Sequence, residues 1–118
     1  MPSWSGLIMT VMTPNKFRTL ALELPDTSES QHMGHPDFRC GDKIFATLGY
    51  PGADWAMVKL TPQQQRLFLK LAPEMFVPCR GIWGRKGATN VRLAAAKVRV
   101  IRSALRTAWK NVNEARDA

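Results

Sequence analysis

The sequence predicts one α+β domain, in which helices accompany an antiparallel sheet. Three observations lead to this prediction. Two segments start with Thr-Pro and continue with apolar residues at helical spacing, residues 27–60 alternate with a period of two, and the last third returns to helical spacing. The 118 residues fit a single domain, which can bury a core without a metal or a disulfide.

The segment TPNKFRTLALELP, residues 13–25, predicts the first helix. Thr13 is a favourable N-cap, and Pro14 is a favourable first helical residue. Apolar side chains follow at positions i, i+3, i+4 and i+7, namely Phe17, Leu20, Ala21 and Leu24, before Pro25 stops the helix. We expect residues 1–11 to be a disordered N-terminal extension and residues 12–118 to form the domain.

Residues 27–60 predict three or four antiparallel strands. The earliest is SESQHM, residues 28–33. The stretch DFRCGDKIFATL alternates on both sides of Gly41 and Asp42, a favourable two-residue hairpin turn, and WAMVKL, residues 55–60, alternates again.

The segment TPQQQRLFLKLAP, residues 61–73, predicts the second helix. Thr61 is the expected N-cap, Pro62 follows it, and Gln64 completes a capping box. The side chains expected to face the core are Leu67, Phe68, Leu71 and Ala72, and Pro73 ends the helix.

The last third of the chain allows two interpretations. Helical spacing could start as early as Ala88, whereas TNVRL, residues 89–93, alternates and contains weak helix formers. We favour a strand there and a closing helix that starts near Ala95. On that helix one arc is apolar, with Val98, Ile101, Leu105 and Trp109, and a basic stripe lies beside it, with Arg99, Arg102, Arg106 and Lys110.

Charge is distributed unevenly along the chain. Residues 1–74 hold seven basic and seven acidic side chains, whereas residues 75–118 hold ten basic and two acidic ones, which accounts for the net charge of +8. Between Glu74 and Glu114 no carboxylate is present to neutralise the cations. These cations must face solvent, a carboxylate from elsewhere in the fold, or an anionic partner.

The segment GRKG, residues 84–87, does not match a known phosphate-binding loop. A P-loop requires GxxxxGK followed by Ser or Thr, and the GxxG loop of a KH domain lies between two helices rather than before a strand. We expect a tight glycine turn at the tip of a hairpin. Trp83 beside it is interpreted either as a core plug, which we favour, or as an exposed platform that stacks a base next to Arg85 and Lys86.

No catalytic residue, metal ligand or cofactor is predicted. His32 and His35 could form half a metal site only on a helix, which Gly34 and Pro36 disfavour. Cys40 and Cys79 occupy apolar settings and form no CxxC motif, so we expect inert thiols in a cytoplasmic protein. No apolar run is long enough to span a membrane, and the first positive side chain is Lys16, which is late for a signal peptide.

Several stretches, taken in order and with their spacing, resemble the MmcQ/YjbR-like family of small bacterial proteins over about residues 12–112. They are ALELPDTSES, HPDFRCGDKIFATL, WAMVKLTPQQQ, APEMFVP, GIWGRKGATNVRLAAA and LRTAWKNV. The resemblance implies a helix, an antiparallel sheet, a helix, two further strands and a closing helix. Proteins similar to this one have been proposed to bind DNA through a "double wing" of strands and loops, and the family brings no catalytic residues to carry over.

The leading functional hypothesis is a non-enzymatic DNA-binding protein of low sequence specificity. A basic hairpin, residues 80–92, and the basic flank of the closing helix would contact phosphates. The expected contacts are Arg85, Lys86, Arg92, Arg102, Arg106 and Lys110 for phosphates, and Trp83 and Asn90 for bases or sugars. Six phosphate contacts predict a salt dependence of log affinity with a slope of about −5.

Two other classes of function stay open at this stage. The chain could be a protein-interaction module that forms a homodimer or docks an acidic partner, with the cations steering association. It could also be an enzyme for a small anionic substrate, in which case a deep pocket would be lined by His35, Arg39 or Asn90.

Overall fold

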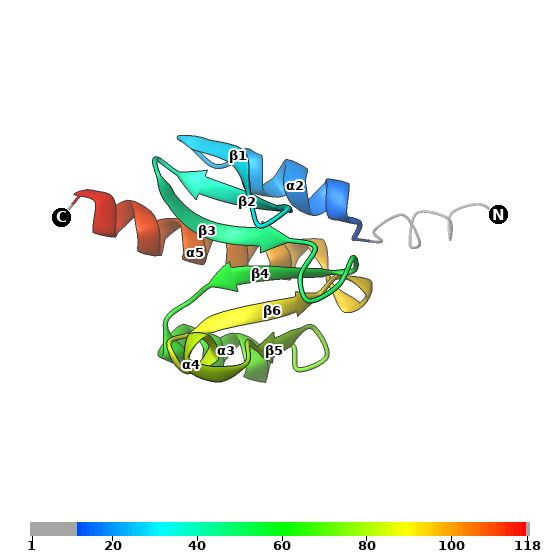
Figure 1. The fold of residues 1–118 in the computed structure, drawn as a ribbon. Coiled ribbons are helices and arrows are strands. Elements are labelled where there is room, and N and C mark those ends of the chain that lie inside the picture. The colour runs from blue at the N-terminus through cyan, green and yellow to red at the C-terminus, as the bar shows by residue number, and fades with distance from the viewer. Residues whose placement is uncertain (1–11, 118) are drawn as a thin grey trace.

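The computed structural model describes residues 12–117, with side chains up to residue 115 (Figure 1). The predicted extension, residues 1–11, lies outside the described residues. The elements follow in the order α2 (Pro14–Leu22), β1 (Thr27–His32), β2 (His35–Cys40), β3 (Lys43–Leu48), β4 (Trp55–Lys59), α3 (Pro62–Leu71), β5 (Phe76–Pro78), α4 (Gly81–Arg85), β6 (Ala88–Arg92), the 3-10 turn η2 (Leu93–Ala95) and α5 (Val98–Asp117). The predicted α+β architecture is confirmed.

The six strands form one antiparallel sheet in the order β1-β2-β3-β4-β6-β5. The predicted turn between β2 and β3 is present, and Gly41 has a φ of 65° there, a left-handed conformation that glycine adopts without strain. A bulge between Phe38 and Arg39 shifts the register of this hairpin. The strand predicted at residues 89–93 is β6, so the helical alternative from Ala88 is wrong.

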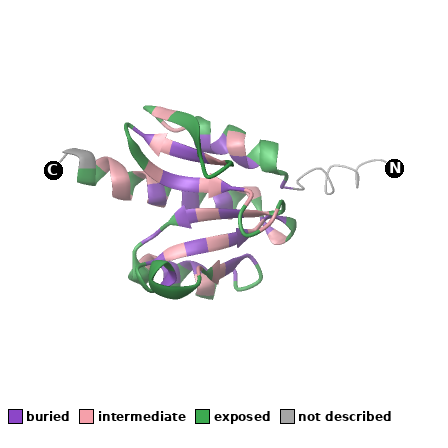
Figure 2. Ribbon diagram, viewed as in Figure 1, coloured by how far each residue is buried: buried purple, intermediate pink, exposed green. Residues whose placement is uncertain are grey.

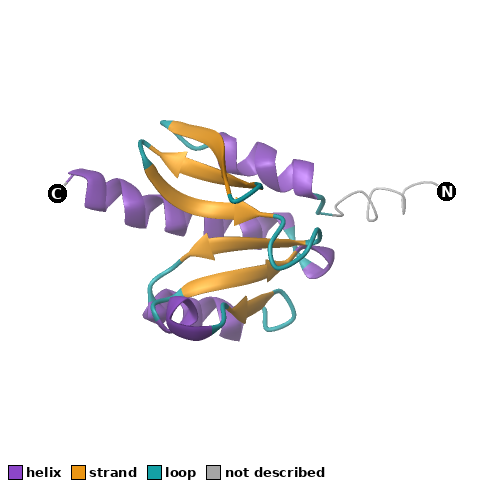
Figure 3. Ribbon diagram, in the orientation of Figure 1, coloured by secondary structure: helices purple, strands orange, loops and turns teal. Residues whose placement is uncertain are grey.

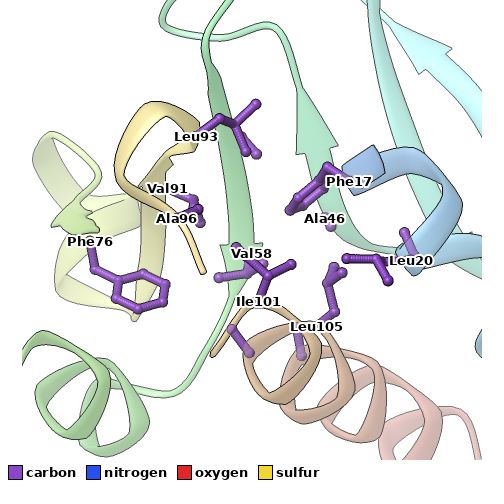
Figure 4. Packing of buried hydrophobic residues seen from close by; sticks show 14 of the residues in the cluster. Phe17, Leu20, Ala46, Val58, Phe76, Val91, Leu93, Ala96, Ile101 and Leu105 are labelled. Carbon is purple, nitrogen blue, oxygen red and sulfur yellow. The ribbon is translucent and has the colours of Figure 1, made fainter. Parts of the chain in front are cut away.

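The helices cover one face of the sheet. In the view of Figure 3, α5 crosses behind β3 and β4, and α2 packs against both α5 and β1. Figure 4 shows Ile101 and Leu105 of α5 on the side of β4 to which Val58 points. All three of these side chains are at most 1% exposed, so the hydrophobic core lies between α5 and the sheet.

On the opposite face of the sheet, β6 carries polar residues. Along β6, Thr89 and Val91 are buried whereas Asn90 and Arg92 are half-buried, as the alternating colours of this strand in Figure 2 show. Because successive side chains of a strand point to opposite faces, Asn90 and Arg92 lie on the face that α5 does not cover.

The starts of two helices have the caps that the sequence predicts. The hydroxyl of Thr13 accepts a hydrogen bond from the backbone N–H of Lys16 at 3.0 Å. At the start of α3, Thr61 and Gln64 form the reciprocal capping box, with distances of 3.1 and 2.9 Å. Each cap satisfies backbone donors that have no partner within the helix.

The inward face of α3 differs from the prediction. Phe68 and Ala72 are buried as expected, but Leu67 and Leu71 are each 65% exposed, and Gln65 is buried in their place. Helical spacing marks an apolar stripe but does not fix how the helix rolls on the sheet. Here the roll is set by Gln65, whose side-chain amide reaches the α4–β6 connection.

The closing helix begins three residues later than predicted. Leu93–Ala95 forms the turn η2, and Ala96 is extended with a ψ of 139°. Leu93 is buried in the core, so the chain turns there before α5 starts at Val98. The apolar spacing alone could not distinguish this turn from the first turn of a helix.

Candidate nucleic-acid interface

The connection between β5 and β6 is a short helix, α4, rather than the predicted glycine turn at a hairpin tip. A Cβ atom on Gly84 would lie 1.7 Å from the carbonyl oxygen of Cys79, and one on Gly87 would lie 2.0 Å from that of Leu60. The two glycines therefore let α4 and the following turn sit directly on neighbouring backbone. This contact fixes the basic segment against the sheet and α3.

Gln65 holds the same connection from the side of α3. Its side-chain amide donates to the carbonyl oxygens of Gly84 and Ala88 and to the hydroxyl of Thr89, each at 3.1 Å. Sequence patterns did not single out Gln65, because a glutamine on a predicted helix is ordinarily a surface residue. The position of α4 therefore depends on a buried polar contact between elements distant in the sequence.

Trp83 is exposed, so the favoured prediction of a core plug is wrong. Its exposed fraction is 64%, and that of its neighbour Ile82 is 53%. The reason is that Gly84, which is buried, occupies the side of α4 that faces the sheet. Trp83 consequently presents its ring to solvent.

Arg85 and Lys86 follow Trp83 and are both exposed. Among the side chains of residues 12–115, neither has an ion-pair partner. Lys86 lines an open groove together with Asn111 of α5, which brings the end of α4 close to the C-terminal turns of α5. Arg106 and Lys110 of α5 are also exposed, with no ion pair to the described side chains.

Arg102 differs from its neighbours on α5 because it has a carboxylate partner. Its guanidinium lies 2.9 Å from Glu23, which follows the last residue of α2, and both side chains are about half exposed. The pair neutralises Arg102 locally, although an exposed pair of this kind contributes only about 0–1 kcal/mol to stability. Glu23 is therefore a carboxylate from elsewhere in the fold that compensates part of the basic stripe.

Asn90 and Arg92 lie apart from the α5 stripe, on the open face of the sheet. The amide oxygen of Asn90 accepts a hydrogen bond from the Cys79 thiol at 3.2 Å. The guanidinium of Arg92 lies 5.0 Å from the ring centre of Trp55 and donates to the carbonyl oxygen of Glu74 at 2.7 Å. The sheet separates these two residues from Arg102, Arg106 and Lys110, so the eight predicted contacts do not form one surface.

The same open face carries an ion pair that sequence patterns did not single out. Arg39 donates two hydrogen bonds to the Asp37 carboxylate, at 2.8 and 3.0 Å, and Asp37 is fully buried. The hydrogen bonds that Arg39 donates to Asp37 raise the pKa of Arg39. The pair could have been predicted from the spacing of two residues on a strand, because this spacing places both side chains on one face.

Comparison with known proteins identifies the chain. The model of the YjbR family matches residues 22–111. The chain belongs to the YjbR family. A crystal structure of Deinococcus radiodurans protein DR2400, with the family-model domain DUF419, is similar at a TM-score of 0.73 and 17% identity, covering 88% of this chain and 80% of that one. At this identity the similarity concerns the fold. No curated protein matches the chain.

Several chemical properties of this YjbR chain limit what its side chains can do. Burial raises the pKa of Cys79 to about 11, so its thiol stays protonated near neutral pH and is a poor nucleophile. His32 and His35 are paired across β1 and β2. In the part of the chain that the structure describes, no three His, Cys, Asp or Glu side chains come together as metal ligands.

Within residues 12–117 of this YjbR domain, no helix has both the length and the apolar character needed to cross a membrane. The longest, α5, carries its basic stripe along the side turned away from the core.

Proposed function

We propose that this YjbR-family protein binds nucleic acid, DNA in the first instance, and catalyses no reaction on it. The observation that supports the proposal most is the surface of α4, where Trp83 is 64% exposed beside the exposed and unpaired Arg85 and Lys86. An aromatic ring next to cations can stack a base while the cations neutralise backbone phosphates.

The proposed surface consists of the exposed residues of α4 and the basic stripe of α5, and these two elements approach each other where Lys86 and Asn111 line the same groove. We define the α4–α5 surface as Trp83, Arg85, Lys86, Arg106 and Lys110. Arg102 contributes less because Glu23 already pairs with it. Asn90 and Arg92 lie on the other face of the sheet, and we leave them out of the proposed surface.

Low sequence specificity follows from the chemistry of this surface. Four cations and one aromatic ring contact phosphates and the faces of bases, whereas sequence is read from hydrogen bonds to base edges. The 20-residue α5 turns its basic stripe to solvent. This stripe consists of arginine and lysine side chains, not of the amide side chains that hydrogen-bond to the edges of bases.

A binding titration with a matched control tests the proposal. Fluorescence anisotropy with a short labelled duplex and the corresponding single strand compares the native chain with the double variant Arg85→Gln/Lys86→Gln. Loss of two phosphate contacts at about 0.7 kcal/mol each weakens affinity roughly tenfold. The control Lys16→Gln/Lys70→Gln removes the same charge from two exposed positions outside the α4–α5 surface and leaves the affinity unchanged. Equal affinity of both double variants would contradict the proposal.

A protein-interaction module is the second candidate function, and the exposed apolar side chains favour it. Leu67 and Leu71 lie one turn apart on α3, each 65% exposed, and Ile82 on α4 is 53% exposed. Leu67 and Leu71 are neighbours on one side of α3, and exposed apolar side chains that gather on one surface mark interfaces. Light scattering after size-exclusion chromatography distinguishes monomer from homodimer, and Leu67→Ser/Leu71→Ser would convert a homodimer that uses this surface into a monomer.

We further propose the cytoplasm as the compartment in which the protein acts. Cys40 and Cys79 are both free thiols, and thiols persist in reducing compartments. A fusion of the full chain to a fluorescent protein would test this location directly, and export to an oxidising compartment would contradict it.

A further inference from the structure

An open groove of about 600 Å³ lies at the end of the sheet where four segments meet. These segments are the turn between β2 and β3, the junction of β4 with α3, the end of α4 at Lys86, and the last turns of α5, which Figure 1 shows at the side marked by the C-terminus. Ligand sites for small organic molecules in proteins are about 300–1,000 Å³. The groove is therefore of the size that takes a small molecule.

The charge of the groove favours a dianion. Lys43, Lys59 and Lys86 line it, against the single carboxylate Asp42, so its lining carries a net charge of +2. All three lysines are exposed, and none has an ion pair with the side chains of residues 12–115. A phosphate monoester carries about −1.5 to −2 charges at pH 7, which matches this surplus.

The groove also offers apolar surface next to the lysines. Leu60 is buried, whereas Ile44 and Val112 are half-buried, and all three line the groove. The Asn111 amide also lines the groove, and it already donates to the Lys59 carbonyl oxygen and to the Gln64 side chain, at 3.1 and 2.8 Å. The lining therefore offers an apolar surface for an apolar group and positive charge for an anion.

We propose that this groove binds a small organic phosphate, in which a phosphate monoester lies among Lys43, Lys59 and Lys86 and an apolar group rests on Ile44 and Val112. The amino end of α3 adds to the attraction, because Thr61 and Pro62 line the groove and the positive end of the helix dipole is located there. This site goes beyond the proposed nucleic-acid surface. Lys43 and Lys59 are outside that surface, and Lys86 belongs to both.

Phenyl phosphate is a suitable probe because it combines the two features. In a titration followed by amide NMR shifts, phenyl phosphate shifts the amides of Ile44, Thr61 and Val112. Phenol keeps the apolar group without the charge, and inorganic phosphate keeps the charge without the apolar group, so each binds more weakly. Equal shifts with phenol, shifts that spread away from the groove, or no binding of phenyl phosphate would overturn the proposal.

Variants of the two lysines that only the groove uses complete the test. Lys43→Gln and Lys59→Gln each raise the Kd for phenyl phosphate about fivefold, the upper range for an exposed ion pair. Lys70→Gln, which removes an exposed lysine outside the groove, leaves the Kd unchanged. Unchanged amide shifts in α2 and β1 establish that the variants are folded, and a Kd unaffected in both groove variants would then reject the site.

The same samples separate this proposal from the proposed function. Phenyl phosphate binding without oligonucleotide binding would support the groove and reject the nucleic-acid surface. Oligonucleotide binding without phenyl phosphate binding would give the opposite result.

Discussion

The first helix and the first hairpin of the protein differ from its last third in how charges are compensated. In the first region, Arg18 pairs with Glu29 at 2.7 Å, and Arg39 pairs with Asp37 at 2.8 Å. In the last third, the one ion pair among the described side chains is that of Arg102, and its partner Glu23 comes from the first region. The unpaired cations of the last third therefore contribute little to the internal stability of the fold, which leaves them available to a partner.

The substitution Gly84→Ala tests whether α4 depends on its close backbone contact, and it has the largest expected effect. The new methyl group would lie 1.7 Å from the carbonyl oxygen of Cys79, so α4 must move away. We expect a loss of about 3 kcal/mol or more in the free energy of unfolding, measured in urea. Gly81→Ala is the control, because Gly81 has a φ of 69° but no atom within 4 Å of the new Cβ, and it costs about 1–2 kcal/mol. Equal losses would show that steric contact does not position α4.

The thiol of Cys79 provides a second contrast within the last third, between a half-buried neutral group and exposed cations. Because its pKa is about 11 instead of 9.0, its thiolate fraction at pH 8 is about 100-fold lower than in the unfolded chain. Alkylation of Cys79 by iodoacetamide at pH 8, followed by mass spectrometry, should slow by about this factor in the native protein.

The sign of the pH effect on stability follows from the same shift. The unfolded thiol ionises at lower pH than the folded one, so this group reduces stability as the pH rises from 9.0 toward about 11. An alkylation rate in the native protein equal to that in urea would contradict the burial of Cys79.

Arg102 and Arg106 lie one turn apart on α5 and differ in ion pairing. Arg102 contacts Glu23 at 2.9 Å, whereas Arg106 has no ion pair with the described side chains. We expect Arg106→Gln to weaken oligonucleotide binding about threefold to fivefold and Arg102→Gln to have a smaller effect. Anisotropy titrations at one salt concentration measure both, and the reverse order would mean that the ion pair does not limit Arg102.

We expect a still smaller effect from Glu23→Gln, which breaks the one ion pair between the two regions that the described side chains form. The free energy of unfolding should change by less than about 1 kcal/mol, because both side chains are about half exposed. Oligonucleotide affinity should rise, because Arg102 becomes available. A fall in affinity would show that Glu23 itself supports the binding surface.

The parts of the fold that could be predicted from the sequence are those set by interactions between residues close together in the chain. The caps at Thr13 and Thr61 and the turn at Gly41 depend on residues within three positions of each other, and all are present. The alternation in β6 likewise identified a strand whose inward residues, Thr89 and Val91, are buried. Such signals are complete within a short segment, so no knowledge of the partner elements is needed.

The candidate site was less predictable because its features depend on contacts between distant segments. Arg102 and Glu23 are 79 residues apart, and no local pattern joins them. Trp83 is exposed because Gly84 occupies the inner side of α4, against the backbone of Cys79. This contact depends on the position of β5, which the sequence pattern of α4 does not contain. The exposure of Leu67 follows from how α3 rolls around Gln65, which the spacing of apolar residues does not determine.

In the proposed function, the unpaired cations of the α4–α5 surface bind the phosphates of nucleic acid. The salt dependence of duplex affinity, measured by anisotropy, reports the number of these contacts. Four contacts, by Arg85, Lys86, Arg106 and Lys110, predict a slope of log affinity against log salt of roughly −3.5. Arg85→Gln/Lys86→Gln should reduce the slope to about −2, whereas Lys16→Gln/Lys70→Gln should preserve it. A slope near zero, or one that the first double variant leaves unchanged, would mean that Arg85 and Lys86 do not bind phosphates.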